Sequence, residues 1–108
     1  MPTIGEQIKS MAAKFKPDQA KGWDRILQIT ITGQGGGTWS FIIKDQKCVI
    51  KDGETPGANM KVTTDVATWN AMTEGKMSGT SAFMSGKLKA QGPMADLIRT
   101  GKAFPGMF

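Results

Sequence analysis

The chain has no histidine and no tyrosine, and Cys48 is the only cysteine among its 108 residues. Without histidine there is no imidazole to act as a general base or a metal ligand, which argues against hydrolase, transferase and zinc-site functions. One cysteine cannot form an intramolecular disulfide, so we expect a reducing compartment. Cys48 has no activating neighbour in the sequence, and we interpret it as a structural thiol.

The chain also lacks long hydrophobic runs and targeting signals. No run approaches the roughly 18 apolar residues that cross a bilayer, and no basic segment followed by an apolar one marks a signal peptide. The sequence ends Pro105-Gly106-Met107-Phe108, which is not a peroxisomal Ser-Lys-Leu-like tripeptide. We therefore expect a cytoplasmic protein, and nothing in the sequence predicts a cofactor or a metal.

Catalytic and phosphate-binding patterns are weak. The acidic residues fall at predicted caps, turns and loop edges, where carboxylates have ordinary local roles. The glycine-rich stretch 33–37 joins two predicted strands, whereas a phosphate loop joins a strand to a helix, so we interpret it as a hairpin connection. The sequence therefore favours a protein that is not an enzyme.

Length and composition predict one domain spanning residues 1–108, large enough for one hydrophobic core. Eight methionines are present. Methionine adapts to irregular spaces, which favours either an accommodating pocket or a methionine-rich core, and the two remain open. The net charge of +5 predicts transient attraction to anionic membranes. Nucleic-acid binding is not expected, because the aromatics Trp39, Phe41 and Trp69 lie on an apolar stripe rather than on a basic face.

The periodicity of apolar residues predicts the secondary structure. Thr3 and Glu6 form a capping-box pattern for a first helix that runs to about Phe15. Alternation predicts strands over 24–32 and 39–44, a tight turn near 45–46, a third strand through Cys48, a fourth over 60–63 and a fifth over 87–91. Helices are predicted after Asp65, and from Pro93 to Gly101.

This order of elements predicts an α+β fold, with a mainly antiparallel five-stranded sheet covered on one face by helices. The segment Trp69–Gly92 then carries a more specific signal. A helix with Trp69 and Met72 ends at Gly75, and after a short linker come Ala82, Phe83, Met84, Gly86, Lys87, Leu88 and Lys89, followed by Gly92 and Met94. This pattern resembles that of the sterol carrier protein-2 family, and the resemblance covers the chain from about Trp23 onward.

The resemblance implies an intracellular lipid-binding or lipid-transfer domain that is not an enzyme. The implied ligand is a fatty acid, fatty acyl-CoA, sterol or phospholipid, held in an apolar tunnel between the sheet and the helices. The residues expected to line or cover the tunnel are Leu27, Ile29, Trp39, Phe41, Ile43, Trp69, Met72, Phe83, Met84, Leu88, Met94, Leu97, Ile98, Phe104 and Phe108. Residues of this kind are more often found in an ordinary core than in a tunnel lining, so a core position remains the alternative for each of them.

An alternative function remains open from the sequence. The apolar C-terminal tail, with Phe104, Met107 and Phe108, is also typical of an interaction module that docks onto itself or onto a partner enzyme.

Overall fold

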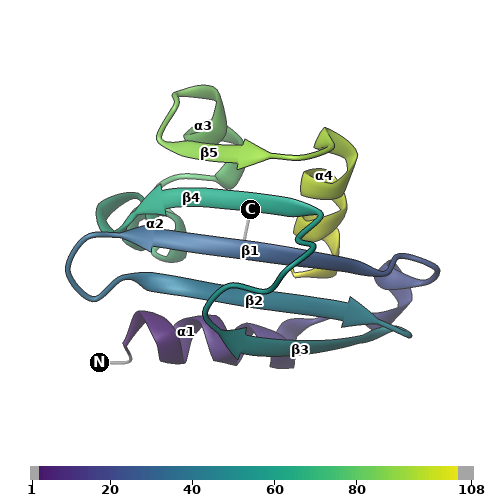
Figure 1. Cartoon of the computed structure of the whole chain (residues 1–108). Coiled ribbons are helices and arrows are strands. Elements are labelled where there is room, and N and C mark those ends of the chain that lie inside the picture. The colour runs from purple at the N-terminus through teal and green to yellow at the C-terminus, as the bar shows by residue number, and fades with distance from the viewer. Residues whose placement is uncertain (1–2, 105–108) are drawn as a thin grey trace.

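The computed structural model describes residues 3–104, which form a five-stranded sheet with helices on one face (Figure 1). The helices are α1 (Ile4–Ser10), α2 (Val66–Thr73), α3 (Gly79–Met84) and α4 (Met94–Ala103), and two short 3-10 helices are η1 (Met11–Lys14) and η2 (Pro17–Ala20). The strands are β1 (Arg25–Thr32), β2 (Gly37–Lys44), β3 (Lys47–Asp52), β4 (Met60–Asp65) and β5 (Leu88–Gln91).

The strands lie in the order β3-β2-β1-β4-β5. The pairs β1/β2, β2/β3 and β4/β5 are antiparallel, and β1/β4 is parallel. Helices α2 and α3 come between β4 and β5, so the last strand joins the sheet edge only after the chain has passed through them. The predicted α+β class, with a mainly antiparallel sheet and helices on one face, is confirmed.

The alternation of apolar residues along the strands builds the core. Leu27 of β1 lies opposite Phe41 of β2 and Met60 of β4, and all three side chains are buried. Because successive side chains point to opposite faces, the same stripe continues at every second residue. The buried set on this face includes Ile29, Ile31, Trp39, Ile43, Val62 and Leu88.

Local capping signals in the sequence correspond to observed helix starts. The Glu6 backbone N–H donates to the Thr3 hydroxyl at 3.1 Å, and the Glu6 carboxylate accepts from the Thr3 N–H at 3.3 Å, which completes the capping box. The Thr68 N–H donates to Asp65 Oδ1 at 2.6 Å at the start of α2. Hydrogen bonding to Thr68 stabilises the carboxylate and lowers the pKa of Asp65.

Several helix boundaries differ from the predicted ones. The first α-helix ends at Ser10 rather than near Phe15. From there the backbone N–H groups bond carbonyls three residues earlier instead of four, and the chain continues as the 3-10 helix η1. Pro93 is the N-cap of α4 rather than its first helical residue. Helix α4 passes through Gly101 and ends at Ala103, since the next backbone N–H still bonds a carbonyl four residues earlier.

At two glycines, another part of the backbone lies too close to leave room for a side chain. A Cβ at Gly36 would overlap the carbonyl oxygen of Ile31, so the β1–β2 hairpin needs glycine at this point. Gly92 has φ 130°, and a Cβ there would lie 2.7 Å from the Asn59 carbonyl oxygen. The stretch 33–37 is thus a hairpin connection, as its position between two strands predicted.

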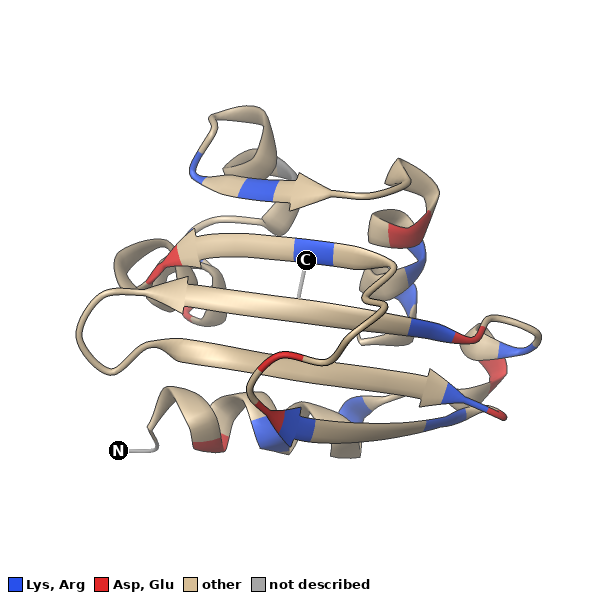
Figure 2. Ribbon diagram, viewed as in Figure 1, with Lys and Arg blue, Asp and Glu red and all other residues tan. Residues whose placement is uncertain are grey.

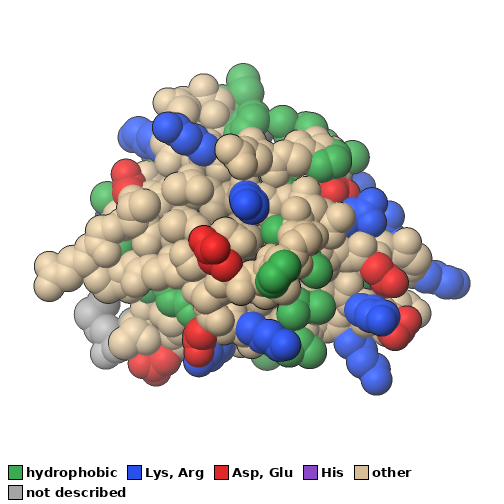
Figure 3. All heavy atoms as spheres, viewed as in Figure 1, with side chains coloured by type: hydrophobic (Ala, Val, Ile, Leu, Met, Phe, Trp, Pro, Cys, Tyr) green, Lys and Arg blue, Asp and Glu red, His purple; other side chains and the backbone are tan. Residues whose placement is uncertain are grey.

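The opposite face of the sheet, turned toward the viewer in Figure 1, carries lysines together with the apolar residues Ile26, Ile42 and Val49. Lys51, Lys61 and Lys89 are exposed on β3, β4 and β5 at positions that alternate with inward side chains (Figure 2). The β3–β4 connection crosses this face, where the Ser40 hydroxyl donates to the Gly53 carbonyl at 2.7 Å. Charged, polar and apolar side chains are mixed over this surface in the space-filling view (Figure 3).

Candidate functional site

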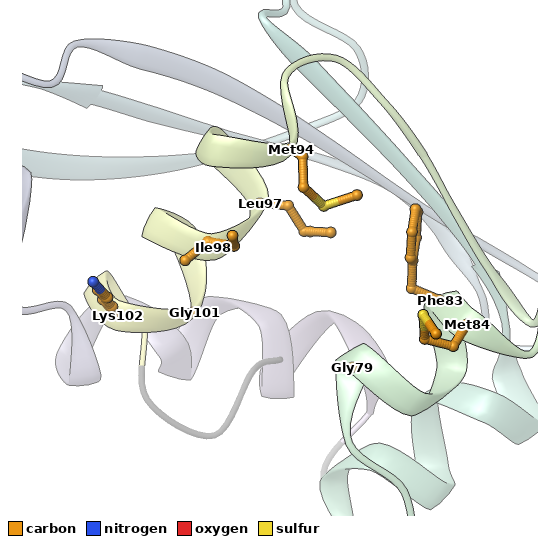
Figure 4. Close-up of a pocket in the computed structure, with 8 residues that line it drawn as sticks. All are labelled: Gly79, Phe83, Met84, Met94, Leu97, Ile98, Gly101 and Lys102. Atoms are coloured by element: carbon orange, nitrogen blue, oxygen red, sulfur yellow. The ribbon is translucent and has the colours of Figure 1, made fainter.

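An open groove of about 470 Å³ lies between α3 and α4 (Figure 4). Its lining residues are Gly79, Phe83 and Met84 from α3, and Met94, Leu97, Ile98, Gly101 and Lys102 from α4. Apart from the Lys102 ammonium, no lining side chain carries an ionisable group. The volume falls within the roughly 300–1,000 Å³ of small-molecule pockets.

The α4 wall of the groove is one face of the helix. Met94, Leu97, Ile98, Gly101 and Lys102 follow the spacing i, i+3, i+4, i+7 and i+8, which places them along one side. In Figure 4, the Met94 and Leu97 side chains extend from α4 toward α3. Because Met94 is 49% exposed and Ile98 is 58% exposed, this side of α4 is only partly covered by the rest of the described chain.

The other side of α4 is held by a buried carboxylate. Asp96 is 5% exposed, accepts the Trp23 Nε1–H at 3.0 Å, and accepts the Arg25 Nε–H at 3.2 Å. Arg25 begins β1 and Trp23 lies just before it, so these contacts fix the first turn of α4 beside the start of that strand. The Thr100 hydroxyl donates to the Asp96 carbonyl one turn later and is itself buried.

Arg99 makes a second polar attachment on that side. Its guanidinium donates to the carbonyls of Gln19 at 2.8 Å and Lys21 at 3.0 Å. The same guanidinium lies 5.6 Å from the centre of the Trp23 ring, within the range of a cation–π contact. Polar contacts therefore hold α4 on one side while its other side carries the groove.

The α3 wall is a single short helix between two polar turns. The Ser81 N–H donates to the Ser78 hydroxyl at its start, and Gly86, with φ 79°, turns the chain into β5. Ala82 points into the core, Phe83 is half-buried, and Met84 is 80% exposed. In Figure 4, Phe83 lies across the groove from Leu97, and Met84 lies beside Phe83 on the α3 side of the groove.

The structure brings together five of the residues predicted from the sequence: Phe83, Met84, Met94, Leu97 and Ile98. The remaining described ones do not line this groove and are buried in the core: Leu27, Ile29, Trp39, Phe41, Ile43, Trp69, Met72, Leu88 and Phe104. Phe108, together with Met107 of the alternative docking tail, lies outside the described residues. A ligand contact for any of these residues stays a prediction.

Phe104, which the sequence placed over the tunnel, is buried in the core, and a covering role for it stays a prediction. It is 1% exposed, and its ring centre lies 5.2 Å from that of Phe15 and 5.3 Å from that of Phe41. The contact with Phe41 is edge-to-face, a favoured arrangement for aromatic pairs. Helix α4 extends two residues beyond the predicted end, which carries Phe104 into the core.

Sequence reasoning missed Gly79, Gly101 and Lys102. The last two could have been found, because they continue the stripe of Met94, Leu97 and Ile98 by one further helical turn. No local pattern marks Gly79, since its place depends on how α3 and α4 approach each other.

Within 3–104, no group of three or more histidine, cysteine, aspartate or glutamate residues could hold a metal ion. Burial raises the pKa of Cys48 to about 12, so its thiolate is scarce at neutral pH. No described helix is long and apolar enough to cross a membrane.

Comparison with known proteins gives one family match and several relatives. The model of the SCP-2 sterol transfer family matches residues 6–104. Hydroxysteroid dehydrogenase-like protein 2 of Bos taurus is 33% identical over 101 residues, which cover 92% of this chain and 24% of that protein. The chain thus spans about a quarter of the length of this curated relative.

Two solved structures share the fold. The structure of palmitated SCP2L2 from Aedes aegypti has a TM-score of 0.72 at 17% identity, covering 95% of this chain and 92% of that one. A double mutant of the sec-alkyl sulfatase PisA1 has a TM-score of 0.82 at 18% identity, covering 99% of this chain and 17% of that one.

Proposed function

Because the chain belongs to the SCP-2 sterol transfer family, we propose that it is a lipid-binding and lipid-transfer domain whose groove between α3 and α4 holds an acyl chain. The observation that carries this proposal is the groove itself, whose side chains are apolar except for Lys102. A long hydrocarbon chain is the ligand that such a surface removes from water most favourably.

The size of the groove favours a single-chain ligand. A methylene group takes up roughly the space of a water molecule, about 30 Å³, so 470 Å³ corresponds to about 15 such groups. A fatty acid or the acyl part of an acyl-CoA matches that number, whereas a phospholipid with two chains exceeds it. Lys102 is the one cation in the lining and is placed to pair with a carboxylate or phosphate.

The energetics suit a carrier. Burying 15 methylenes contributes at most ~12 kcal/mol at about 0.8 kcal/mol each, against an association cost of ~4–15 kcal/mol. A lipid that leaves a bilayer for the groove exchanges one apolar environment for another, so transfer is close to neutral. In this proposal the domain is not an enzyme, and the dehydrogenase-like name of the relatives belongs to proteins about four times as long.

The test is titration of delipidated protein with palmitate, in which calorimetry and native mass spectrometry measure binding. We expect one equivalent to bind, and at 100 times the dissociation constant to add ~2.7 kcal/mol of stability. The proposal would be refuted if fatty acids of several chain lengths neither bound nor raised the melting temperature.

A matched pair of variants locates the site. Leu97 and Ile50 are both half-buried apolar residues packed against the core, but only Leu97 lines the groove. We expect Leu97→Asp to weaken palmitate binding by about tenfold or more, because an unpaired carboxylate would face the acyl chain. Ile50→Asp should leave the affinity of the folded fraction unchanged. Equal affinities for the two variants would place the ligand elsewhere.

A further inference from the structure

Exposed apolar side chains of this protein gather at one place. Among the described residues, the large hydrophobic side chains that are exposed are Val49, Met84, Met94 and Ile98. Three of the four lie at the groove, although they come from two different helices. Figure 3 shows hydrophobic side chains gathered along the upper edge of the molecule, over the region where Figure 1 places α3 and α4.

The charge around these side chains has one sign. Helix α3 has no ionisable side chain, and the only acid of α4, Asp96, is buried and paired with Arg25. Lys102 stands exposed at the C-terminal end of the groove. The exposed side of the two helices is therefore apolar with a cation and without a carboxylate.

We propose that the groove rim, defined as Met84, Met94, Ile98 and Lys102, is the surface that docks onto an anionic lipid bilayer. Apolar side chains beside a lysine match the boundary between acyl chains and anionic headgroups. This inference rests on the proposed function, because a groove that exchanges lipid has to open toward the bilayer. Docked by its rim, the groove receives an acyl chain without exposing it to water.

A bilayer fits this surface better than a second copy of the chain does. A standard protein interface takes about 20–30 residues on each side. The rim supplies four, on helices of six and ten residues. Insertion of a few apolar side chains beside a cation needs no such area, and Met84 and Met94 have unbranched side chains that adapt to a fluid partner.

The experiment measures binding to sedimentable vesicles of phosphatidylcholine with phosphatidylserine. We expect the double variant Met84→Ser with Ile98→Ser to lose vesicle binding by about tenfold or more, since two exposed apolar anchors are removed. Val49→Ser is the matched control, because Val49 is 54% exposed but lies on β3 away from the groove. It should bind vesicles about as well as wild type does.

A second control addresses the basic face of the sheet. The triple variant Lys51→Gln, Lys61→Gln, Lys89→Gln removes three exposed lysines from the face opposite the helices. We expect it to retain most vesicle binding. Loss of binding in this variant with retention in the rim variant would overturn the proposal and assign docking to the sheet.

Two further readouts separate the outcomes. Palmitate titration of the wild-type protein in the absence of vesicles tests the proposed function alone, and Val49→Ser and the triple lysine variant, whose changed residues do not line the groove, should bind palmitate like wild type. Light scattering tests for a dimer that the rim variant abolishes, which would overturn the proposal in favour of a second copy. Failure of the wild-type protein to bind anionic vesicles would overturn it outright, whatever the palmitate result.

Discussion

Removal of the Asp96 carboxylate should loosen α4 and with it one wall of the groove. In Asp96→Ala the Trp23 N–H loses its acceptor at 3.0 Å, and Arg25 loses its partner at 3.2 Å. Both interactions join α4 to the start of β1. The variant therefore weakens the attachment of the helix without altering any residue that lines the groove.

The magnitude follows from the burial of each partner. A buried donor left without an acceptor costs ~1–3 kcal/mol. The Arg25 side chain is 37% exposed, so solvent screens the ion pair and its loss adds about 1 kcal/mol or less. The sum is roughly 1–4 kcal/mol. With an unfolding entropy of about 2.1 cal/mol/K per residue, 108 residues give ~0.23 kcal/mol/K, and the melting temperature should fall by about 4–18 °C.

Thermal unfolding followed by circular dichroism measures this shift, with two comparisons. Asp96→Asn keeps an oxygen that can accept from Trp23 and should lose less stability than Asp96→Ala. Arg25→Gln should cost least, because the pair is partly screened. A fall of less than about 3 °C for Asp96→Ala would show that apolar contacts hold α4, and the reasoning on its polar attachment would be refuted.

Two further predictions concern the core and the free thiol. Phe104→Ala should cost ~3–5 kcal/mol, or about 13–22 °C in melting temperature, because its ring is fully buried between two other phenylalanines; a loss below about 1 kcal/mol would show that the ring contributes little to the core. Cys48 should react with a disulfide reagent at pH 8 far more slowly in the native than in the denatured protein, since its pKa is raised to about 12. The folded state holds the Cys48 proton more tightly, so this contribution to stability is present below pH 9.0 and declines as the pH rises toward 12. Equal reaction rates in the two states would contradict the burial of the thiol.

Much of the fold could be predicted because its signals are local. Alternation over β1 and β2, the capping box at Thr3 and the cap at Asp65 depend on residues within a few positions of each other. The tight turn at Asp45 and Gln46 could also be placed between two alternating runs. Tertiary packing decides the details, and it extended α4 beyond Gly101 against the local expectation.

The candidate site could be predicted only in part. The spacing of Met94, Leu97 and Ile98 indicates an apolar face of α4. The residue types on such a face are the same whether it contacts a ligand or packs against other side chains. For this reason the sequence does not distinguish whether the strand residues, Trp69 and Met72 line a cavity or pack in the core. The attachment of α4 was not foreseeable either, since Trp23 and Asp96 are separated by 73 positions.

The two sides of α4 differ in chemistry: one side makes polar contacts with the rest of the chain, and the other carries apolar side chains that stay exposed at the groove. A helix held to the sheet only by apolar side chains would gain stability by burying its remaining apolar face, which would close the space beside α3. Asp96 and Arg99 instead make directional hydrogen bonds, which fix the orientation of the helix about its axis. With that orientation fixed, Met94 and Ile98 stay exposed at the groove although burial would favour them elsewhere. The polar side of α4 thus keeps its apolar side exposed, as the proposed ligand and bilayer contacts require.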